Sequence, residues 1–256
     1  MIPDLIFDIG MHNGDDTAHY LSEGFRVVAV EANPLLAESG RNRFSDAIAC
    51  GKLTICNVGI SDREGVREFW INREHSEFSS LLPDVAGRNG LPATPVEIPV
   101  VTLSSVLVKY GVPFYLKVDI ERYDVQCIKA LQSLEKSDLP VYVSVEANEL
   151  SYLEILRQLG YTGFKCIDQT AHNIRRDLGP TWFRWLRRKT MRAADLMGIY
   201  APPFPQGSSG AFGEKSPGSW QPFEAVAFDW RNVMSGKSGR LYRKGWFDFH
   251  AARTYI

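Results

Sequence analysis

Acidic residues and glycines concentrate between positions 8 and 31 of the chain. Asp8, Gly10 and Gly14 form the pattern Asp-x-Gly-x-x-x-Gly, and Glu31 follows the next apolar run, RVVAV. Glycines let a backbone approach a ligand closely, a helix N-terminus offers unpaired amides, and an acid at the tip of a second strand can bind a ribose diol. These residues therefore predict a site for a nucleoside with a charged tail, with Glu31 on the ribose.

The spelling of this loop distinguishes two kinds of nucleoside cofactor. A dinucleotide site has Gly-x-Gly-x-x-Gly, and here His12 or Asn13 stands where the middle glycine would admit a pyrophosphate. Asp8, Asp15 and Asp16 would repel a pyrophosphate but attract a sulfonium and an ammonium group. S-adenosylmethionine carries both cations, so the loop favours it over NAD.

A second set of carboxylates follows two later strands. Asp119 lies at the end of the apolar run FYLKVDI, where ligands of open α/β sheets bind, so it is the main catalytic candidate. Alternatively, it caps the following helix or holds the amino group of the cofactor. Glu121 either shares the cleft or forms an ion pair with Lys117 or Arg122.

Glu146 is predicted to face Asp119 across the cleft. Two such carboxylates could hold a divalent cation and a diol substrate, or one could act as a base, whereas helix capping is the alternative for Glu146. No local ligand set such as Asp-x-Asp is present, so no metal is predicted. In an in-line methyl transfer, Asp119, Glu146 or His172 would accept the hydroxyl proton, and His172 has the most useful ordinary pKa.

The elements that position these residues alternate between strand and helix, which is typical of a parallel sheet. The sequence predicts strands at 5–9, 26–30, 52–58, 114–120, 139–145, 161–167 and 223–230. Asn57, Ser61 and Asp62 follow the third strand and either contact the adenine or form an ordinary turn.

The alternation is interrupted twice. Strands at 66–71 and 95–101 flank a polar loop, 72–94, which we interpret as an insertion beside the cleft, with Ser79 and Ser80 as a hydroxyl pair that could contact ligand. The second interruption, 170–222, is interpreted as a variable cap.

Within this cap, the basic and aromatic segment 182–192 either docks on an acidic partner, a membrane surface or a nucleic acid, covers the substrate, forms a dimer contact, or packs on the domain. The segment 201–222 is rich in Pro, Gly and Ser, and we predict a mobile loop over the cleft. There, Phe204, Phe212 and Trp220 either stack on sugars or anchor the loop.

Composition limits the remaining classes of function. The 256 residues, 45% of them hydrophobic, suit a single domain, with a core at 1–168 and 223–235. A net charge of −1 gives no general case for nucleic acid or membrane binding. Four cysteines without metal-type spacing, and no apolar stretch long enough for a membrane span or a signal peptide, predict a cytoplasmic protein with buried thiols. The aromatic, basic tail 241–256 is expected on the surface or in a homo-oligomer contact.

Four phrases of the sequence resemble one family. DIGMHNGDDT, VVAVEANP, NVGISDREG and LKVDIE, in this order and spacing, resemble the FkbM family of S-adenosylmethionine-dependent methyltransferases. The resemblance implies a class I methyltransferase fold, which is an α/β, Rossmann-like, seven-stranded and mostly parallel sheet with strand seven antiparallel and helices on both faces. It also implies methylation of hydroxyl oxygens, commonly on sugars and other small natural products.

The resemblance further implies which residues contact the cofactor. With His12 added from the same loop, these positions are Asp8, Gly10, Asn13, Gly14, Thr17, Glu31, Ala32, Asn57, Ser61 and Asp119. The chain departs from the family pattern after Asp119, where Glu121-Arg122-Tyr123-Asp124 replaces Glu-Gly-Ala-Glu. The bulkier Arg122 and Tyr123 are expected to change the start of the next helix and the class of substrate.

Three classes of function therefore stay open. The first is an O-methyltransferase acting on a saccharide or another small molecule. The others are a nucleotide-cofactor oxidoreductase, which the loop spelling disfavours, and a methyltransferase-like binding module, which the retained acids Asp8, Glu31 and Asp119 disfavour.

Overall fold

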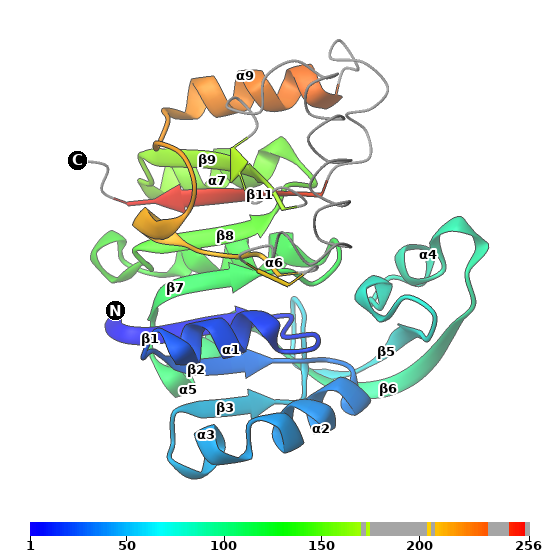
Figure 1. Cartoon of the computed structure of the whole chain (residues 1–256). Helices are drawn as coiled ribbons and strands as arrows, with labels where there is room; N and C mark the ends of the chain where they lie inside the picture. Colours follow the sequence, from blue (N-terminus) through cyan, green and yellow to red (C-terminus); the bar gives the residue numbers. More distant parts are fainter. Residues whose placement is uncertain (170–172, 175–203, 206–207, 235–245, 254–256) are drawn as a thin grey trace, which may run out of the picture.

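A twisted β-sheet forms the centre of the molecule (Figure 1). The computed structural model describes residues 1–169, 173–174, 204–205, 208–234 and 246–253. Within these residues the strand order of the sheet is β10-β9-β11-β8-β7-β1-β2-β3. The strands are β1 (Ile2–Ile9), β2 (Arg26–Val30), β3 (Leu53–Cys56), β7 (Pro113–Val118), β8 (Tyr142–Glu146), β9 (Gly163–Asp168), β10 (Asn173–Ile174) and β11 (Phe247–Ala252).

The strand directions confirm the predicted class of fold. Strand β1 pairs in parallel with β2 and β7, and the parallel pairing continues to β3 and β8. Strand β11 lies between β8 and β9 and is antiparallel to both. Apart from the two-residue β10, the described part of the chain therefore forms the seven-stranded sheet with a reversed last strand that the sequence predicts.

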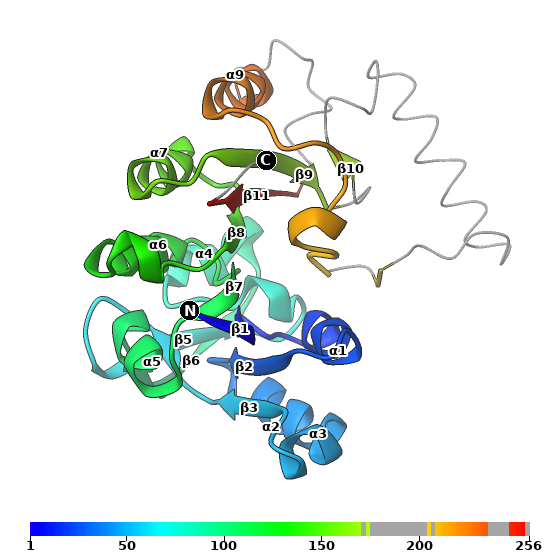
Figure 2. The ribbon, with the colours of Figure 1, turned by 90° about the vertical axis from the view of Figure 1, so that its left-hand side faces the viewer.

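Helices cover both faces of this sheet (Figure 2). Figure 2 shows α5, α6 and α7 on one side and α1, α2 and α3 on the other. These helices are α1 (Asp15–Ser22), α2 (Pro34–Arg43), α3 (Ser45–Ala49), α5 (Leu103–Tyr110), α6 (Asp124–Ala130) and α7 (Leu150–Leu159). Two begin as the sequence suggests, because Thr102 accepts a hydrogen bond from the Ser105 amide at α5 and Pro34 occupies the first turn of α2.

The predicted insertion is part of a second sheet beside the main one. Residues 59–101, hereafter the arm, form this region. Strands β4 (Gly59–Ile60), β5 (Gly65–Asn72) and β6 (Ala93–Val101) make a second sheet in the order β4-β6-β5. The segment between β5 and β6 contains the short helix α4 (Pro83–Ala86) and 3₁₀ turns at Ser76–Phe78 and Arg88–Gly90. In Figure 1 this arm extends on the side toward which the parallel strands point, so it lies on the side where a ligand is expected.

The prediction of a last strand at 223–230 is wrong, because these residues belong to helix α9 (Phe223–Met234). Phe223, Val226, Ala227 and Trp230 are buried at a spacing of three and four residues, which forms one helix face. The last strand is instead β11, inside the tail that the sequence placed on the surface. All six residues of β11 are buried, because they complete the sheet between β8 and β9.

Residues 208–222, predicted as part of a mobile loop over the cleft, pack against the sheet. The Phe212 ring stacks on Tyr115 with 4.1 Å between centroids, and the Trp220 ring stacks on Tyr142. Both rings are buried, so Phe212 and Trp220 anchor this segment rather than offering open faces to a sugar. Phe204 contacts the His19 ring edge to face, whereas the basic segment 182–192 lies outside the described residues.

Two general expectations can be compared with the structure. In the described part of the chain, no helix has both the length and the apolar character needed to cross a membrane. All four cysteines are free thiols, and Cys127 and Cys166 are buried as expected, whereas Cys50 is exposed.

Candidate functional site

The glycine loop after β1 is shaped by close approach and by left-handed backbone. Gly10 has φ +90°, and a Cβ atom on it would lie 1.8 Å from the Asp119 carbonyl oxygen. Gly14 precedes α1 with φ +82°, and a Cβ there would meet the Phe44 ring at 2.6 Å. Only glycine fits at these two positions, so the sequence pattern reflects how tightly the loop, residues 10–17 and hereafter the cofactor loop, is packed.

Glu31 lies directly against the cofactor loop. Its carboxylate accepts hydrogen bonds from the His12 amide at 2.7 Å and from the Asn33 amide at 2.8 Å. Burial raises the pKa of Glu31 to about 7, although the two amides favour its charged form. The Asn57 side chain donates to the carbonyls of Glu31 and Ala32 at 2.8 and 3.3 Å, so it supports the turn that carries the acid.

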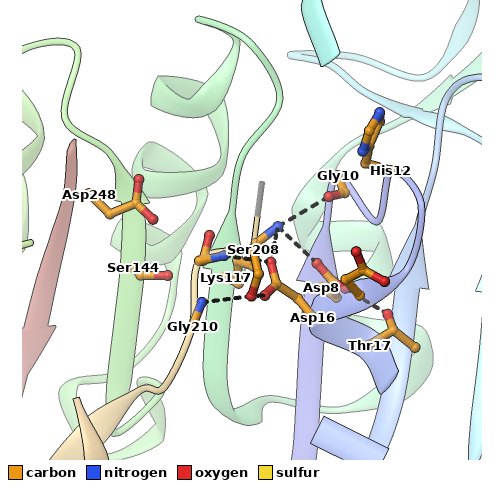
Figure 3. Close-up of polar contacts among 12 residues, drawn as sticks. Asp8, Gly10, His12, Asp16, Thr17, Lys117, Ser144, Ser208, Gly210 and Asp248 are labelled. Carbon is orange, nitrogen blue, oxygen red and sulfur yellow. Dashed lines mark hydrogen bonds and ion pairs between the residues drawn. The ribbon is translucent and has the colours of Figure 1, made fainter. Parts of the chain in front are cut away.

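A buried network of charges lies beneath the cofactor loop (Figure 3). Thr17 donates to Asp8 at 2.6 Å, and the Lys117 ammonium donates to Asp8 at 3.1 Å and to the Gly10 carbonyl at 3.2 Å. The same ammonium is 3.5 Å from Asp16. Although burial lowers the pKa of Lys117, the carboxylates of Asp8 and Asp16 raise it well above its ordinary value. Asp8 and Thr17 have no exposed surface, so the structure places them as supports of the loop.

Asp16 connects the cofactor loop to a distant part of the chain. The Ser208 hydroxyl donates to Asp16 at 2.5 Å, and the Ser209 amide donates to its other oxygen at 3.1 Å (Figure 3). The sequence analysis did not find this connection, because residues 16 and 208 share no local pattern. A signal for Lys117 did exist, since it is a charged residue within the apolar run FYLKVDI.

Two predicted cofactor residues have contacts typical of turns. Ser61 is buried in the second sheet, where its hydroxyl donates to Asp62 at 2.9 Å and accepts from Arg67 at 3.0 Å. Asn13 is exposed at the tip of the cofactor loop, and its amide group donates to Asp15 at 2.8 Å. Both arrangements agree with the ordinary turn that the sequence left open for Ser61.

The four carboxylates Asp119, Glu121, Glu146 and Asp248, hereafter the acidic edge, lie around the ends of β7 and β8 and the start of β11. Val118 pairs with Val145, so Asp119 and Glu146 follow neighbouring positions, and Glu146 pairs with Asp248. Burial raises the pKa of Asp119, and burial followed by the charge of Asp119 raises the pKa of Glu146 to about 7. Carboxylates with such values can exchange protons near neutral pH.

Glu121 has a different partner from the two that the sequence suggested. Its carboxylate forms an ion pair with Arg88 of the arm, whereas Lys117 pairs with Asp8 and Asp16. Burial, followed by the charge of Glu146, raises the pKa of Glu121 to about 8. Glu121 and Arg122 have φ of +52° and +71°. Two of the residues that depart from the family pattern therefore have a left-handed backbone conformation.

The arm forms one wall of the site. His12 of the cofactor loop is 2.8 Å from the Ser76 hydroxyl, and Ser80 donates to the Glu121 carbonyl at 3.0 Å. The Ser79 hydroxyl accepts from the Asn72 amide at 3.1 Å. Contacts of Ser79 and Ser80 therefore bind the arm to itself and to the acidic edge.

Two further site predictions concern His172 and a metal ion. His172, the third base candidate, lies outside the described residues. Among the residues that are described, no group of three or more His, Cys, Asp or Glu side chains is arranged to hold a metal ion.

The fold and the site together define a class of protein. A parallel sheet with a reversed last strand, a glycine loop after β1 and an acid after β2 form the class I methyltransferase arrangement. A model of the methyltransferase FkbM domain matches residues 8–166. The chain belongs to this FkbM methyltransferase family.

Comparison with solved structures finds similar folds at low sequence identity. FkbM methyltransferase from Methylobacillus flagellatus KT is 16% identical with a TM-score of 0.40, and the match covers 61% of this chain and 35% of that chain. The C-terminal domain of precorrin-6Y C5,15-methyltransferase from Rhodobacter capsulatus is 12% identical, with a TM-score of 0.38 and coverage of 66% and 68%. A SAM-dependent methyltransferase from Thiobacillus denitrificans, in complex with S-adenosyl-L-homocysteine, is 12% identical, with a TM-score of 0.38 and coverage of 98% and 86%. A search of curated proteins finds no match.

Proposed function

We propose that this protein transfers the methyl group of S-adenosylmethionine to a hydroxyl oxygen of a saccharide or another small natural product. The observation that carries the proposal is the position of Asp119. Its amide donates to the Ile9 carbonyl at 2.9 Å, where the sheet order reverses between β1 and β7. Ligands of open α/β sheets bind at such a reversal, so Asp119 lies beside the reacting group.

The residues present fit a nucleoside with a cationic tail. Glu31 retains lone pairs for a ribose diol beyond the two amide donors it already accepts. Asp119 has no side-chain hydrogen-bond partner within the described residues, so its carboxylate is free for a cationic tail. When bound, S-adenosylmethionine supplies an electrophilic methyl group on a sulfonium centre.

The acidic edge then orients and deprotonates the acceptor hydroxyl. Asp119 and Glu146 are the two bases within the described chain, and a pKa of about 7 suits Glu146 to accepting a proton near neutral pH. The arm, tied to Glu121 through Arg88, limits access of water to this space. Most of the acceleration is expected from alignment of the hydroxyl rather than from the base.

Calorimetric titration tests the cofactor assignment. We expect S-adenosylhomocysteine to bind and Glu31→Gln to weaken its binding at least tenfold, because the variant loses the charged acceptor of the ribose hydroxyls. Glu38→Gln, an exposed acid on α2, is the matched control and should leave the affinity unchanged. A parallel titration with NAD addresses the oxidoreductase alternative, and preference for NAD would contradict the proposal.

The acceptor assignment needs a second experiment. A panel of sugars and polyketide-like alcohols is incubated with S-adenosylmethionine, with and without magnesium, and products are examined by mass spectrometry for a gain of one methyl group on oxygen. Cofactor binding without turnover of any acceptor would favour the binding-module alternative. Action on a free small molecule in the cytoplasm, without nucleic acid, and a homo-oligomeric state stay predictions.

A further inference from the structure

Three members of the acidic edge lie next to one another across the sheet. Asp248 pairs with Glu146 in the β8–β11 register, and Asp119 follows the neighbouring strand β7. Side chains of paired residues share one face of a sheet, so the three carboxylates are on the same side. Figure 3 shows the Asp248 carboxylate pointing from β11 toward the strands that carry Ser144 and Lys117.

The hydrogen bonds around Asp248 are incomplete. One of its oxygens accepts from the Gln169 side chain at 2.6 Å, but its other oxygen, Oδ1, is buried and has no partner among the described residues. The Gln169 side-chain oxygen is also buried and unpartnered. Both side chains are only 3% exposed. When Asp248 is charged, both orphan atoms are acceptors, so the missing partner is a hydrogen-bond donor.

Within the described residues, the cations near this edge form no ion pair with Asp119, Glu146 or Asp248, although the charges of Arg88 and Arg122 lower the pKa of Glu146. Lys117 lies between Asp8 and Asp16, and Arg88 pairs with Glu121. Burial and repulsion from nearby carboxylates raise the pKa values of Asp119, Glu146 and Asp248, so a bound cation would favour their charged forms. Burying such charges together is costly unless a cation joins them.

The cofactor is expected at a different position. Asp248 lies two strands beyond β7, which is roughly 10 Å from Asp119 at the usual spacing of about 4.8 Å per strand. The cofactor loop and Glu31 lie on the other side of β7, at β1 and β2. The unpaired acceptors therefore belong to the space in which the acceptor molecule binds.

We propose that Asp248, together with Glu146 and Gln169, forms a subsite for a protonated amine on the acceptor, so that the substrate is an amine-bearing alcohol such as an amino sugar. An ammonium group has three donors and one positive charge, which match the two orphan oxygens and favour the charged carboxylates. A divalent metal is the less suitable occupant, because no group of three acids in the described residues has a metal-binding arrangement. This inference rests on the proposed function for the identity of the reacting hydroxyl.

The test compares charged and neutral forms of the same sugar. Glucosamine, galactosamine and mannosamine, and the N-acetyl derivative of each, are titrated into the full chain saturated with S-adenosylhomocysteine, and binding is followed by ligand-observed NMR. We expect at least one amine to bind at least tenfold more tightly than its N-acetyl form. Asp248→Asn should abolish that difference and leave the affinity for S-adenosylhomocysteine within twofold. Glu146→Gln is the second variant if Asp248→Asn folds poorly, and Glu38→Gln is the control.

Each outcome gives a decision. Equal binding of amine and N-acetyl sugars, or a preference that survives both variants, overturns the subsite. Displacement of the amine by magnesium at the same carboxylates also overturns it, in favour of a metal site. If S-adenosylhomocysteine does not bind, the proposed function fails, whereas an amine preference that depends on Asp248 still upholds the subsite.

Discussion

The cofactor loop and the acidic edge both involve buried carboxylates, but these carboxylates differ in how completely they are hydrogen-bonded. Under the cofactor loop, Asp8 has both Thr17 and Lys117 as partners, and Asp16 has Ser208, the Ser209 amide and Lys117. At the acidic edge, Asp248 retains a buried oxygen without a partner. Both oxygens of Asp8 and of Asp16 thus have partners, whereas Asp248 at the edge lacks a donor within the described residues.

This difference suggests that the carboxylates under the loop hold the backbone in place, whereas those at the edge recognise a ligand. A carboxylate with all its partners in place holds the backbone where the cofactor needs it, and no ligand is required to stabilise it. Carboxylates at the edge have raised pKa values, about 7 for Glu146 and about 8 for Glu121, because burial and mutual repulsion disfavour their charges. Glu121 and Glu146 are consequently expected to change protonation near neutral pH, as is Glu31 beside the cofactor loop.

The largest effect on stability is expected from Gly10→Ala, which disrupts the cofactor loop. The new Cβ would meet the Asp119 carbonyl oxygen at 1.8 Å, so the ends of β1 and β7 must separate. We expect a loss of about 4 kcal/mol or more in the free energy of unfolding, measured with urea. Gly24→Ala is the matched control, because Gly24 also has φ +90° but has nothing within 4 Å, and it should cost only about 1–2 kcal/mol. Equal losses would show that backbone angle, not crowding, governs Gly10.

Crowding at Gly10 illustrates what the sequence can reveal. The unit from Leu5 to Val30 was predictable because its signals are local, namely an apolar run, glycines at a fixed spacing and an acid after the second run. Helix α9 was misread because 223–230 was expected to return to the sheet as its last strand, whereas its buried residues repeat every three to four positions and form a helix face. Strand β11 is defined by its neighbours β8 and β9, and such distant pairing leaves little trace in six residues.

The two sides of the site also differed in how far they could be predicted. Glu31 was predicted to bind the ribose, which stays a prediction, and the structure places its carboxylate against the loop because strand and loop are adjacent in sequence. Asp248 was missed because its strand was not recognised, and the role of Arg88 was missed because the arm brings it to Glu121 from 33 residues away. The sequence therefore offered candidate residues on both sides of the site, but the contacts of Arg88 and Asp248 became visible only in the structure.

Lys117→Met should have the next largest effect, because it removes the cation shared by Asp8 and Asp16. Two buried carboxylates would then repel each other, and we expect a loss of about 3 kcal/mol in the free energy of unfolding at pH 7. Lys52→Met, at an exposed position, should change the stability by less than about 0.5 kcal/mol. The loss should shrink at lower pH, because burial raises the pKa of Asp8 and a protonated Asp8 no longer needs a cation. A loss that does not depend on pH would mean that packing, and not charge, is responsible.

Glu31→Gln should change the pH dependence of stability by about 3 kcal/mol in total. The pKa of Glu31 rises from 4.5 to about 7 on folding, so between these values the folded state holds a proton that the unfolded state has released. The stability of the native protein therefore falls as the pH rises through this window, and the glutamine variant should lose this slope. Urea unfolding from pH 4.5 to 8, without cofactor, measures it. An unchanged slope in the variant would assign the titration to other carboxyls, such as Glu146.

The smallest effect is expected at Arg122, which stands where the family pattern has glycine. Its φ of +71° costs about 1–2 kcal/mol in an arginine, whereas glycine adopts this angle freely but gains entropy when unfolded. Arg122→Gly should thus stabilise the protein by about 0.5–1 kcal/mol in urea unfolding.

Arg122→Ala is the control for that experiment, because it removes the charge and keeps the Cβ atom. We expect no gain in stability from alanine. Equal stability of the glycine and alanine variants would contradict the proposed backbone strain at Arg122. In both variants the pKa of Glu146 should rise further above 7, since Arg122 lowers it in the native chain. A carboxyl NMR titration of Glu146 would measure that rise. Strained backbone that brings a cation to the acidic edge is then a cost retained for the site and not for the fold.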